Sequence, residues 1–392
     1  MVDIILKKKR ERPVQLHHPW IFSGAIDLVR GKPQPGDTVR VLDAGKQFLA
    51  WGHFSPCSEI RIRAVEWDEN SPPDEKWLSD RIKASVQKRD LLKGTDSKRL
   101  IFGESDHLPG LVADQYNEYL VLQTLTPAME KWKAFLVREL AGIIRPKAIY
   151  ERNDTESRGL EGLEPACSVL YGASWPGLIP VSENGLKILV DLEHGQKTGY
   201  YLDQRMNRRI VARFAEGRSI LDCFSYSGGF SLFCLSRGAV SVTCVDSSAE
   251  ALDLVEKNMK LNQLPPDRYT GINGNAFEVL RKMRDQGKKL DMIILDPPKL
   301  APSGSHVRKA LRAYKDINLL AFKLLNPGGI LVTFSCSGGV DMSTFRTMIS
   351  WACQDAGIDA QIIGQLSQAE DHPIRLSFPE SEYLRGLICR VP

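Results

Sequence analysis

The chain lacks the features that mark several classes of protein. None of its eight cysteines are spaced as Cys-x-x-Cys, and its seven histidines show no metal-ligand spacing. We therefore expect reduced thiols and no bound metal. No apolar run reaches the roughly 18 residues of a membrane-spanning helix, and the first residues lack the order of a secretory signal. These absences favour a cytoplasmic protein that is not bound to a membrane.

A strong charge of one sign is also missing. The net charge is only +4, so a polyanionic partner such as RNA is permitted but not demanded. The basic run from Lys7 to Arg12 is, like most charge runs, consistent with a solvated surface. The apolar fraction of 43% and the charged fraction of 26% are ordinary for a globular protein. A length of 392 residues favours two or three domains.

The pattern along the chain changes twice. Residues 1–72 contain short segments of alternating apolar and polar residues broken by Gly-Asp and Gly-Lys, which predict a small β barrel or sandwich. Residues 75–180 predict a compact α+β module, with a helix over 75–93, another over 127–143 and a long loop from Thr155 to Pro180.

Residues 185–392 alternate between strands and helices. Continuous apolar runs predict strands at 220–222, 242–246, 292–296 and 330–334. Helices are predicted between them, including 249–261 and 314–325, the latter closed by Asn326-Pro-Gly-Gly. Such a pattern predicts a parallel sheet covered on both faces, and therefore an α/β fold.

A glycine-containing loop, Asp222 to Gly229, follows the first of these strands and opens a helix. Gly228 and Gly229 let the backbone approach a ligand, and Asp246 can accept hydrogen bonds from ribose hydroxyls. The loop lacks the full G-x-G-x-x-G spacing and carries the acid Asp222, which favours S-adenosylmethionine over a dinucleotide. A tight turn in some other α/β protein is the alternative.

Two further strand ends carry candidate chemistry. Asp296-Pro297-Pro298-Lys299 ends one strand, and its rigid backbone leaves carbonyls and a carboxylate to face a polar ring. Cys336 lies between two serines at the end of the next strand. A buried apolar thiol is the ordinary role for such a residue, and a nucleophile is the functional one.

The segment Gln196 to Arg205 is dense in polar and aromatic residues. Asp203 can cap a helix there, while Tyr200 can lie against the cofactor and Lys197 and Arg205 can contact phosphates. We also predict RNA contacts for Lys299 and for Lys315, which belongs to a basic patch with Lys309 and Arg312.

Several long motifs resemble the ribosomal large subunit methyltransferase I family, and the resemblance runs nearly end to end. They are His18 to Ile26, His194 to Arg205, Cys223 to Phe230, Asp296 to Lys299, Tyr314 to Asn318 and Phe334 to Gly338. The resemblance implies a PUA RNA-binding domain over 1–72, a central α+β domain over 75–180 and a Rossmann-like, seven-stranded methyltransferase domain over 185–392. It implies methyl transfer from S-adenosylmethionine to C5 of a cytosine in 23S rRNA or a large-subunit precursor.

The resemblance also implies roles for individual residues. Cys336 and Asp296 would face the base. We also expect Asp296, and Asp222 from its place at a strand end, to border the cofactor. The other cofactor contacts that we expect are Tyr200, Tyr226, Gly228, Gly229, Asp246 and Asn275. Asn275 departs from the pattern, because such domains often carry an aspartate there to accept from the adenine amino group.

Cytosine C5 is a poor nucleophile, so Cys336 is expected to add to C6 first while Asp296 stabilises the charge that builds on the ring. Pro298 and Lys299 stand where some cytosine-C5 enzymes have a second cysteine, so we predict a one-cysteine mechanism. The base that removes the C5 proton and the oligomeric state stay open. Two alternatives also stay open: methylation of a purine nitrogen without covalent catalysis, and a non-enzymatic RNA-binding assembly factor.

Overall fold

The structure is a computed structural model that describes residues 2–175, 177–300 and 307–392, with side chains from 309 onward in the last range. The chain forms two compact units. Unit 1 comprises residues 1–181, 190–202 and 370–381, and unit 2 comprises residues 182–189, 203–369 and 382–392. Residues 190–202 and 370–381, which fall within the predicted 185–392 domain, thus belong to unit 1. The three predicted domain boundaries stay predictions.

The first part of unit 1 is a β module, as the alternating pattern predicts. Its six-stranded sheet has the order β2-β6-β5-β4-β1-β3. The apolar positions of the alternating segments point inward, and Ile4, Val39 and Ile62 are fully buried. The elements are β1 (Asp3–Leu6), α1 (Arg12–Gln15), β2 (Trp20–Phe22), β3 (Ile26–Arg30), β4 (Thr38–Leu42), β5 (Phe48–Phe54) and β6 (Ile60–Glu66).

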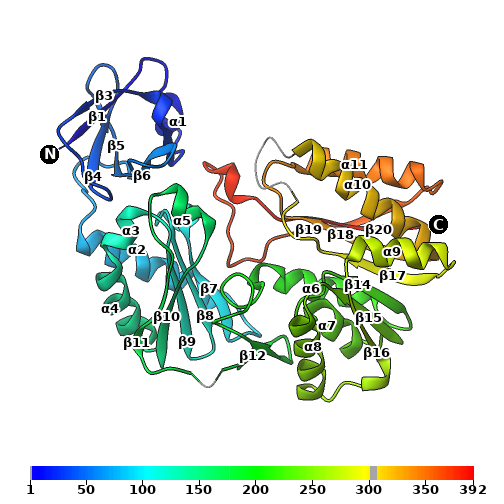
Figure 1. Ribbon diagram of the computed structural model, residues 1–392. Coiled ribbons are helices and arrows are strands. Elements are labelled where there is room, and N and C mark those ends of the chain that lie inside the picture. Colours follow the sequence, from blue (N-terminus) through cyan, green and yellow to red (C-terminus); the bar gives the residue numbers. More distant parts are fainter. Residues whose placement is uncertain (1, 176, 301–306) are drawn as a thin grey trace. The chain divides into compact units, whose positions relative to one another are not determined.

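The second part of unit 1 is an α+β module built on a five-stranded sheet with the order β11-β10-β9-β8-β7 (Figure 1). Apolar residues of α2 and α4, such as Ile82 and Leu136, pack on the sheet. The elements are α2 (Glu75–Lys88), β7 (Ser97–Phe102), β8 (Leu111–Tyr116), β9 (Tyr119–Thr124), α3 (Pro127–Lys131), α4 (Lys133–Ile144), β10 (Ala148–Asn153), α5 (Glu156–Leu160) and β11 (Ala166–Gly172).

Two sequence predictions in this module were wrong in detail. The helix predicted over 127–143 is two helices, α3 and α4, which meet at Trp132. The predicted loop from Thr155 to Pro180 contains α5 and the edge strand β11. Most side chains of β11 are exposed, so the strand lacks the apolar alternation that would reveal it.

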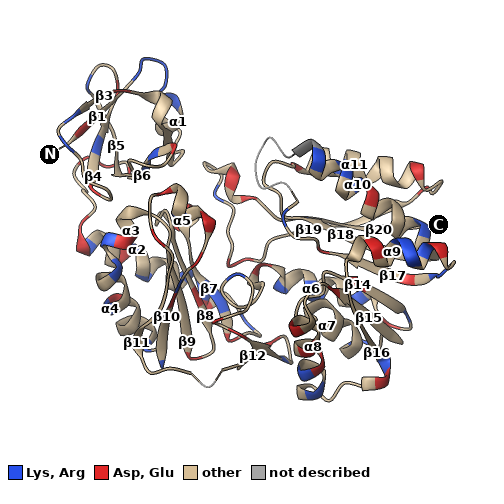
Figure 2. Ribbon diagram, viewed as in Figure 1, with Lys and Arg blue, Asp and Glu red and all other residues tan. Residues whose placement is uncertain are grey.

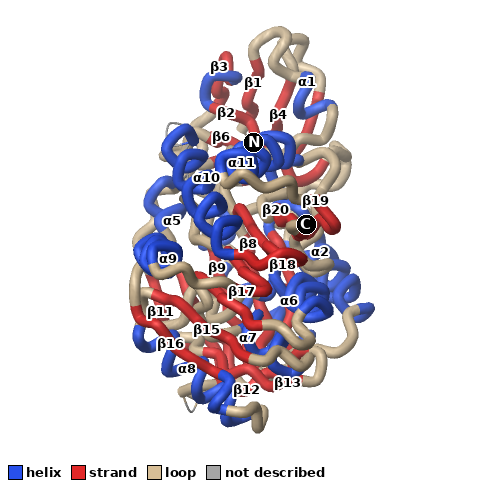
Figure 3. The backbone as a smooth tube through the Cα atoms, turned by 90° about the vertical axis from the view of Figure 1, so that its right-hand side faces the viewer, coloured by secondary structure: helices blue, strands red, loops and turns tan. Residues whose placement is uncertain are grey.

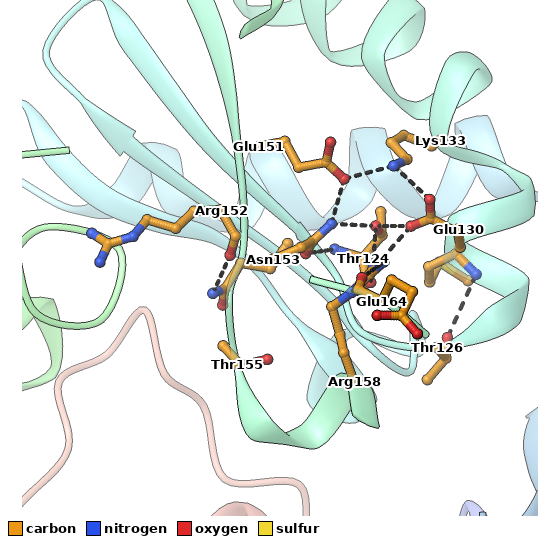
Figure 4. A network of polar contacts seen from close by, with 12 residues as sticks. Thr124, Thr126, Glu130, Lys133, Glu151, Arg152, Asn153, Thr155, Arg158 and Glu164 are labelled. Carbon is orange, nitrogen blue, oxygen red and sulfur yellow. Dashed lines mark hydrogen bonds and ion pairs between the residues drawn. The ribbon is translucent and has the colours of Figure 1, made fainter. Parts of the chain in front are cut away.

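A group of charged and polar side chains at the ends of β9 and β10 forms a closed arrangement, which we call the Glu130 network (Figure 4). Glu130 Oε2 accepts hydrogen bonds from Thr124 Oγ1 at 2.7 Å and from Arg158 Nη1 at 2.9 Å. Lys133 Nζ pairs with Glu130 Oε1 at 2.5 Å and with Glu151 Oε1 at 2.6 Å. Asn153 Nδ2 completes the network by donating to Glu151 Oε1 at 2.5 Å. Two acids are thus matched by two cations.

The two parts of unit 1 are joined by buried ion pairs. Arg63 of β6 donates to both oxygens of Glu161, at 2.6 and 3.1 Å, and Ser55 Oγ donates to Glu161 Oε2 at 2.5 Å. Because Arg63 is only 8% exposed, it belongs to this contact and not to a solvated basic surface. Trp20 Nε1 also donates to Glu104 Oε1 at 2.9 Å.

Unit 2 contains a seven-stranded sheet with the order β16-β15-β14-β17-β18-β20-β19. The first five strands in this order are parallel, and β20 is antiparallel to both its neighbours. The strands are β14 (Ser219–Cys223), β15 (Ser241–Asp246), β16 (Tyr269–Asn273), β17 (Leu290–Leu295), β18 (Leu325–Ser335), β19 (Gln361–Ser367) and β20 (Arg385–Arg390). The predicted α/β fold with a Rossmann-like sheet is confirmed. A small hairpin, β12 (Ile179–Glu183) and β13 (Leu186–Val190), precedes it in the chain.

Helices cover both faces of this sheet (Figures 1 and 3). The face covered by α9, α10 and α11 holds a large apolar core around Tyr314, Phe345 and Leu331. The helices of unit 2 are α6 (Arg205–Val211), α7 (Gly229–Ser236), α8 (Ala249–Leu261), α9 (Ala276–Asp285), α10 (Val307–Leu324) and α11 (Met342–Asp355). Basic and acidic positions are interspersed along α8 and α9 (Figure 2). The predicted helix 249–261 has the observed bounds of α8.

One strand in unit 2 begins earlier than predicted. The predicted helix 314–325 corresponds to the second part of α10, which ends at Leu324, just before Asn326-Pro-Gly-Gly, but this segment already belongs to β18. Gly328 N donates to Pro392 O at 3.0 Å, and Val391 N donates to Gly329 O at 3.0 Å. The last residues of the chain thus give this glycine-rich segment a backbone partner. Among the described residues, no helix has the length and apolar character needed to cross a membrane.

Candidate active site

Polar side chains gather at one edge of the unit 2 sheet because the parallel strands all end there. Asp222 lies in β14, Asp246 ends β15, Asp296 follows β17 and Cys336 follows β18. The strand order reverses between the neighbours β14 and β17, and ligands of open α/β sheets bind at such a switch point. The edge between Asp222 and Asp296 is therefore the place where a ligand is expected.

The loop between β14 and α7 is held tightly against the end of β15. Phe224 N and Ser225 N both donate to Val245 O, at 2.8 and 3.2 Å. Gly228 has a φ of +79°, and a Cβ there would lie 2.8 Å from a methyl carbon of Val255. Glycine is required at this position by both the backbone angle and the close approach. Gly229 follows as the first residue of α7.

Asp246 organises this loop. Its Oδ2 accepts from Tyr226 N at 2.8 Å and its Oδ1 accepts from Ser248 N at 3.0 Å. Tyr226 has a φ of +46°, so the loop turns sharply where this bond forms. The carboxylate is only half-buried, and it keeps lone pairs for the hydroxyl groups of a ribose.

Asp222 is a buried acid with an unused oxygen. It is 1% exposed, and its Oδ2 accepts from Ser231 Oγ at 2.6 Å. Its Oδ1 accepts no hydrogen bond from the described residues. Burial raises the pKa of Asp222 to about 7. An anion-forming group in this state fits a cationic ligand, such as the sulfonium or ammonium group of S-adenosylmethionine.

Asn275 has a local role at the start of α9. Its Oδ1 accepts from Phe277 N at 2.9 Å, which makes it the N-cap of the helix. The side chain is exposed. A bond from the adenine amino group would share the same oxygen, so the predicted cofactor contact stays a prediction.

Asp296 belongs to a cluster of polar side chains. Its Oδ2 accepts from Gln204 Nε2 at 2.9 Å. Burial, followed by the negative charge of Asp203, raises the pKa of Asp296 to about 7. Asp203 in turn accepts a hydrogen bond from Tyr383 Oη at 2.6 Å. At neutral pH a large fraction of Asp296 is therefore protonated and can donate a hydrogen bond.

Cys336 lies beside the turn that follows Asp296. Its Sγ is 3.8 Å from the carbonyl oxygen of Pro297, within the range of a weak S–H hydrogen bond. All eight cysteines lie in the described ranges, and Cys336 is the one that is neither exposed nor buried. Burial raises the pKa of Cys223 and Cys389, the latter to about 12, which keeps these thiols inert. Tyr314 Oη, 3.2 Å from Ser337 Oγ, braces the turn that carries Cys336.

The other predicted site residues differ in location and in exposure. Tyr200 and Lys197 belong to unit 1, where Tyr200 is 3% exposed and its backbone N–H donates to Tyr116 Oη at 3.3 Å. Arg205 begins α6 and is 3% exposed. Lys299 is exposed, and Lys315 pairs with Asp355 of α11 at 2.6 Å. Roles for these residues in binding cofactor or RNA stay predictions.

Sequence reasoning missed the polar residues that bond to Asp296, Asp203 and Gln204. Gln204, Asn207 and Tyr383 have no assigned role in the sequence patterns, although Gln204 lies within one of the long motifs. Their signal is weak because polar residues at helix starts are usually caps. In the described residues no cluster of three or more His, Cys, Asp or Glu side chains could hold a metal ion.

Comparisons with known proteins support the fold and the cofactor. Residues 162–343 match the model of a family described as S-adenosylmethionine-dependent methyltransferase, and residues 4–67 match that of a PUA-like domain. Solved structures with the same fold include a candidate SAM-dependent methyltransferase from Streptococcus mutans, with a TM-score of 0.85, 18% identity and full coverage of both chains. Another is a candidate methyltransferase complexed with SAH, with a TM-score of 0.87, 19% identity and full coverage of both chains.

Curated relatives extend over the whole chain. A protein of Shigella boydii named ribosomal RNA large subunit methyltransferase I is 44% identical over 393 residues, covering 100% of this chain and 99% of the relative. A protein of the same name from Salmonella arizonae is 44% identical over 391 residues, covering 99% of this chain and 97% of the relative. The predicted PUA-like and methyltransferase regions and the predicted cofactor, S-adenosylmethionine, are thus confirmed. The chain belongs to the ribosomal RNA large subunit methyltransferase I family.

Proposed function

We propose that this protein methylates C5 of a cytosine in large-subunit ribosomal RNA, with Cys336 as the covalent nucleophile and Asp296 as the acid that faces the ring. The single observation that carries the proposal is the position of Cys336. Its half-buried thiol follows β18 and lies 3.8 Å from the carbonyl of Pro297, next to Asp296. A purine-nitrogen methyltransferase has no use for a nucleophile at this place. The names of the relatives support a ribosomal RNA substrate.

The chemistry balances with these two side chains. The Cys336 thiolate forms a bond to C6, and the displaced electron pair is received at N3, where Asp296 supplies a proton. When bound, S-adenosylmethionine supplies the methyl group that forms the new bond to C5. Loss of the C5 proton to a base then restores the C5–C6 double bond. This step expels Cys336 as a thiolate, and the N3 proton returns to Asp296.

The cofactor would be held on the β14 and β15 side of the edge. Asp246 would accept hydrogen bonds from the ribose, and Asp222 would face a positive group. Gly228 and Gly229 would allow close approach of the loop that contains Tyr226. Asp296 would then separate the cofactor from the base.

The RNA must present an unpaired or flipped cytosine, since C6 is inaccessible inside a duplex. The PUA-like region would hold the surrounding RNA, and Lys7, Lys8 and Lys9 are exposed there. Lys299 is exposed on the turn next to Asp296 and is the best placed of the predicted RNA-binding lysines.

The experiment that tests the substrate is mass mapping of 23S rRNA from cells that lack this protein, with and without its restoration. We expect one 5-methylcytosine to disappear and to return. The loss of a methylated purine instead would support the alternative enzyme. The loss of no methyl group would support a non-enzymatic assembly factor and contradict the proposal.

The experiment that tests the mechanism uses RNA with 5-fluorocytosine at the mapped position. Fluorine cannot leave as a proton does, so the covalent adduct with Cys336 should accumulate in the presence of S-adenosylmethionine. Cys336→Ala should abolish both the adduct and turnover. The matched control is Cys167→Ala, because Cys167 is an exposed thiol of unit 1. An adduct that persists in Cys336→Ala would contradict the proposed nucleophile.

A further inference from the structure

The start of α6 buries two amide side chains in unit 2. Gln204 is 2% exposed and Asn207 is 1% exposed. A buried amide is costly unless its donors and acceptors are bonded, so the direction of each bond matters. These two amides form a chain that ends at Asp296.

The donors and acceptors in this series of hydrogen bonds are fixed because the series begins at a backbone carbonyl. Asn207 Nδ2 lies 2.9 Å from Ser367 O, which can only accept, so this atom must be the nitrogen. The same nitrogen lies 2.6 Å from Gln204 Oε1 and donates to it. The other end of the Gln204 amide is therefore Nε2, which donates to Asp296 Oδ2 at 2.9 Å. The orientation of both amides follows from contacts alone.

This direction has a consequence for the Asp296 carboxyl group. Because Gln204 presents an N–H group, Oδ2 is held as an acceptor. The proton of the neutral acid is then best placed on the other oxygen, Oδ1. Asp296 thus offers a donor on the atom that Gln204 does not occupy.

Pyrimidines differ at the ring nitrogen that such an acid would meet. Cytosine has a lone pair at N3, whereas uracil has an N–H group there. A donor on Oδ1 bonds to cytosine N3 but opposes the N–H of uracil and leaves both groups unpaired. Sites that strand a buried polar group in this way discriminate strongly, by about 10⁴-fold or more in known cases.

We propose that Gln204 and Asn207 are positioning residues that keep the Asp296 proton on the oxygen facing the base, and that this selects cytosine over uracil. The proposal rests on the proposed function and deepens it. Neither residue touches the base. Each acts through Asp296, and their loss should change which base is accepted more than it changes cofactor binding.

The sharpest test is Asn207→Asp. A protonated aspartic acid at this position can donate to Ser367 O through one oxygen and accept from Gln204 Nε2 through the other. The Gln204 amide is then reversed and presents Oε1 to Asp296. The Asp296 proton moves to Oδ2 to meet it, and Oδ1 becomes an acceptor that suits uracil N3–H.

The measurement compares kcat/KM for an RNA fragment that carries the mapped cytosine and for a copy that has uracil at that position. Mass spectrometry distinguishes 5-methylcytosine from 5-methyluridine. We expect the cytosine preference of Asn207→Asp to fall at least about 30-fold, with a gain of activity on uracil. Affinity for SAH, which reports folding of unit 2, should stay within about threefold.

A second variant guards against misfolding of the first. Gln204→Met removes the donor to Oδ2 and should lower the cytosine preference by about tenfold. The control is Asn153→Asp, the same chemical change at a buried amide in unit 1, which should leave the preference unchanged. Unchanged preference in both test variants would overturn this inference alone, whereas a wild-type protein that forms no 5-methylcytosine would overturn the proposed function.

Discussion

Two groups of partly or fully buried acids, one in each unit, are treated in opposite ways. In the Glu130 network of unit 1, each oxygen of Glu130 accepts from a cation or a hydroxyl group (Figure 4). In unit 2, the buried Oδ1 of Asp222 accepts nothing from the part of the chain that the structure describes. An acid whose oxygens all have partners within the fold contributes to stability, whereas a buried oxygen without a partner is a candidate for binding a ligand.

The pKa directions follow the same division. Burial raises the pKa of Glu130, but hydrogen bonds from Lys133, Thr124 and Arg158 outweigh it and leave the pKa below its usual value. At Asp222 and Asp296 burial prevails, and each pKa is raised to about 7. The partners of Glu130 therefore stabilise its ionised form, whereas Asp222 and Asp296 keep their protons to a higher pH than usual.

Replacing Asp296 with Asn should give the largest effect. Asparagine keeps the shape and the bond from Gln204 but cannot transfer a proton to the ring. We expect kcat to fall about 10²- to 10⁴-fold, as for the loss of a general acid. Steady-state methylation of the target RNA at saturating cofactor measures the effect.

The pH profile supplies the control for this variant. In the wild type the protonated fraction of Asp296 decreases as the pH rises through about 7, so a declining limb is expected above that pH. Asp296→Asn should lack this limb. Glu130→Gln makes the same chemical change in the Glu130 network and should lower stability while activity per folded molecule is kept. A wild-type limb that survives in Asp296→Asn would contradict the assigned role.

Breaking the Glu130 network should instead lower the stability of unit 1. Lys133→Met removes the cation shared by Glu130 and Glu151, and it leaves two carboxylates facing each other. Because Lys133 is 21% exposed and Glu130 28% exposed, these pairs are only partly buried, and the free energy of unfolding of unit 1 should fall by about 1–3 kcal/mol. Denaturant unfolding at pH 7 measures it.

Acid should narrow the difference between Lys133→Met and the wild type. The lowered pKa of Glu130 contributes stability that is present above its ordinary value of 4.5 and is lost as the pH falls through the folded value. At lower pH the wild type loses this contribution, and the variant has less of it to lose. A difference that grows on acidification would show that the network is not held by charge.

Sequence patterns predicted the acids of unit 2 better than those of unit 1. Asp222, Asp246 and Asp296 each come at the end of a continuous apolar run, and parallel strands bring such ends to one edge. Glu130 and Glu151 follow no such rule, because Glu130 lies in α3 and Glu151 in β10, and Lys133 of α4 pairs with both only in the folded chain. Local sequence patterns thus predict polar residues that the ends of several parallel strands bring together. They do not predict a cluster that depends on one particular set of tertiary contacts.

The contacts that refine the site are far apart in sequence. Gln204 and Asp296 are separated by 92 positions, and Asp203 and Tyr383 by 180. No periodic pattern in the sequence predicts contacts between residues that are so far apart. The strand β11 and the glycine-rich start of β18 were missed for a related reason. Exposed residues in β11 and glycines in β18 remove the apolar pattern by which a strand is predicted, and these segments are strands because of the backbone partners they pair with.

Asp222→Asn tests the contrast between the two groups of acids, because it should raise the free energy of unfolding and weaken the binding of S-adenosylmethionine. The folded pKa of about 7 lies above the ordinary value of 3.8, so the folded state binds the proton more tightly. Asp222 therefore costs stability as the pH rises from about 4 to 7. The amide variant should be more stable by about 1–3 kcal/mol at pH 8 and unchanged at pH 4. Thermal unfolding at the two pH values measures this.

The same variant should bind S-adenosylmethionine about 10- to 100-fold more weakly, since a charged hydrogen-bond partner is worth roughly 1.5–3 kcal/mol. Isothermal titration measures the affinity. If Asp222→Asn is less stable than the wild type at pH 8, or binds the cofactor normally, then Asp222 has a structural role like that of Glu130 in the Glu130 network.

Ser231→Ala tests the same acid with a smaller change. Ser231 Oγ donates to Asp222 Oδ2 at 2.6 Å, and this bond favours the ionised form and lowers the pKa. Its removal should raise the pKa of Asp222 further and leave less carboxylate at neutral pH. Affinity for S-adenosylmethionine should then fall about 3- to 10-fold at pH 6.5, an effect of about 1 kcal/mol for one hydrogen bond. At pH 8.5 Asp222 ionises in both proteins, so the two affinities should converge. A deficit that is equal at both pH values would mean that Ser231 acts through packing, and that the charge of Asp222 is not what the cofactor meets.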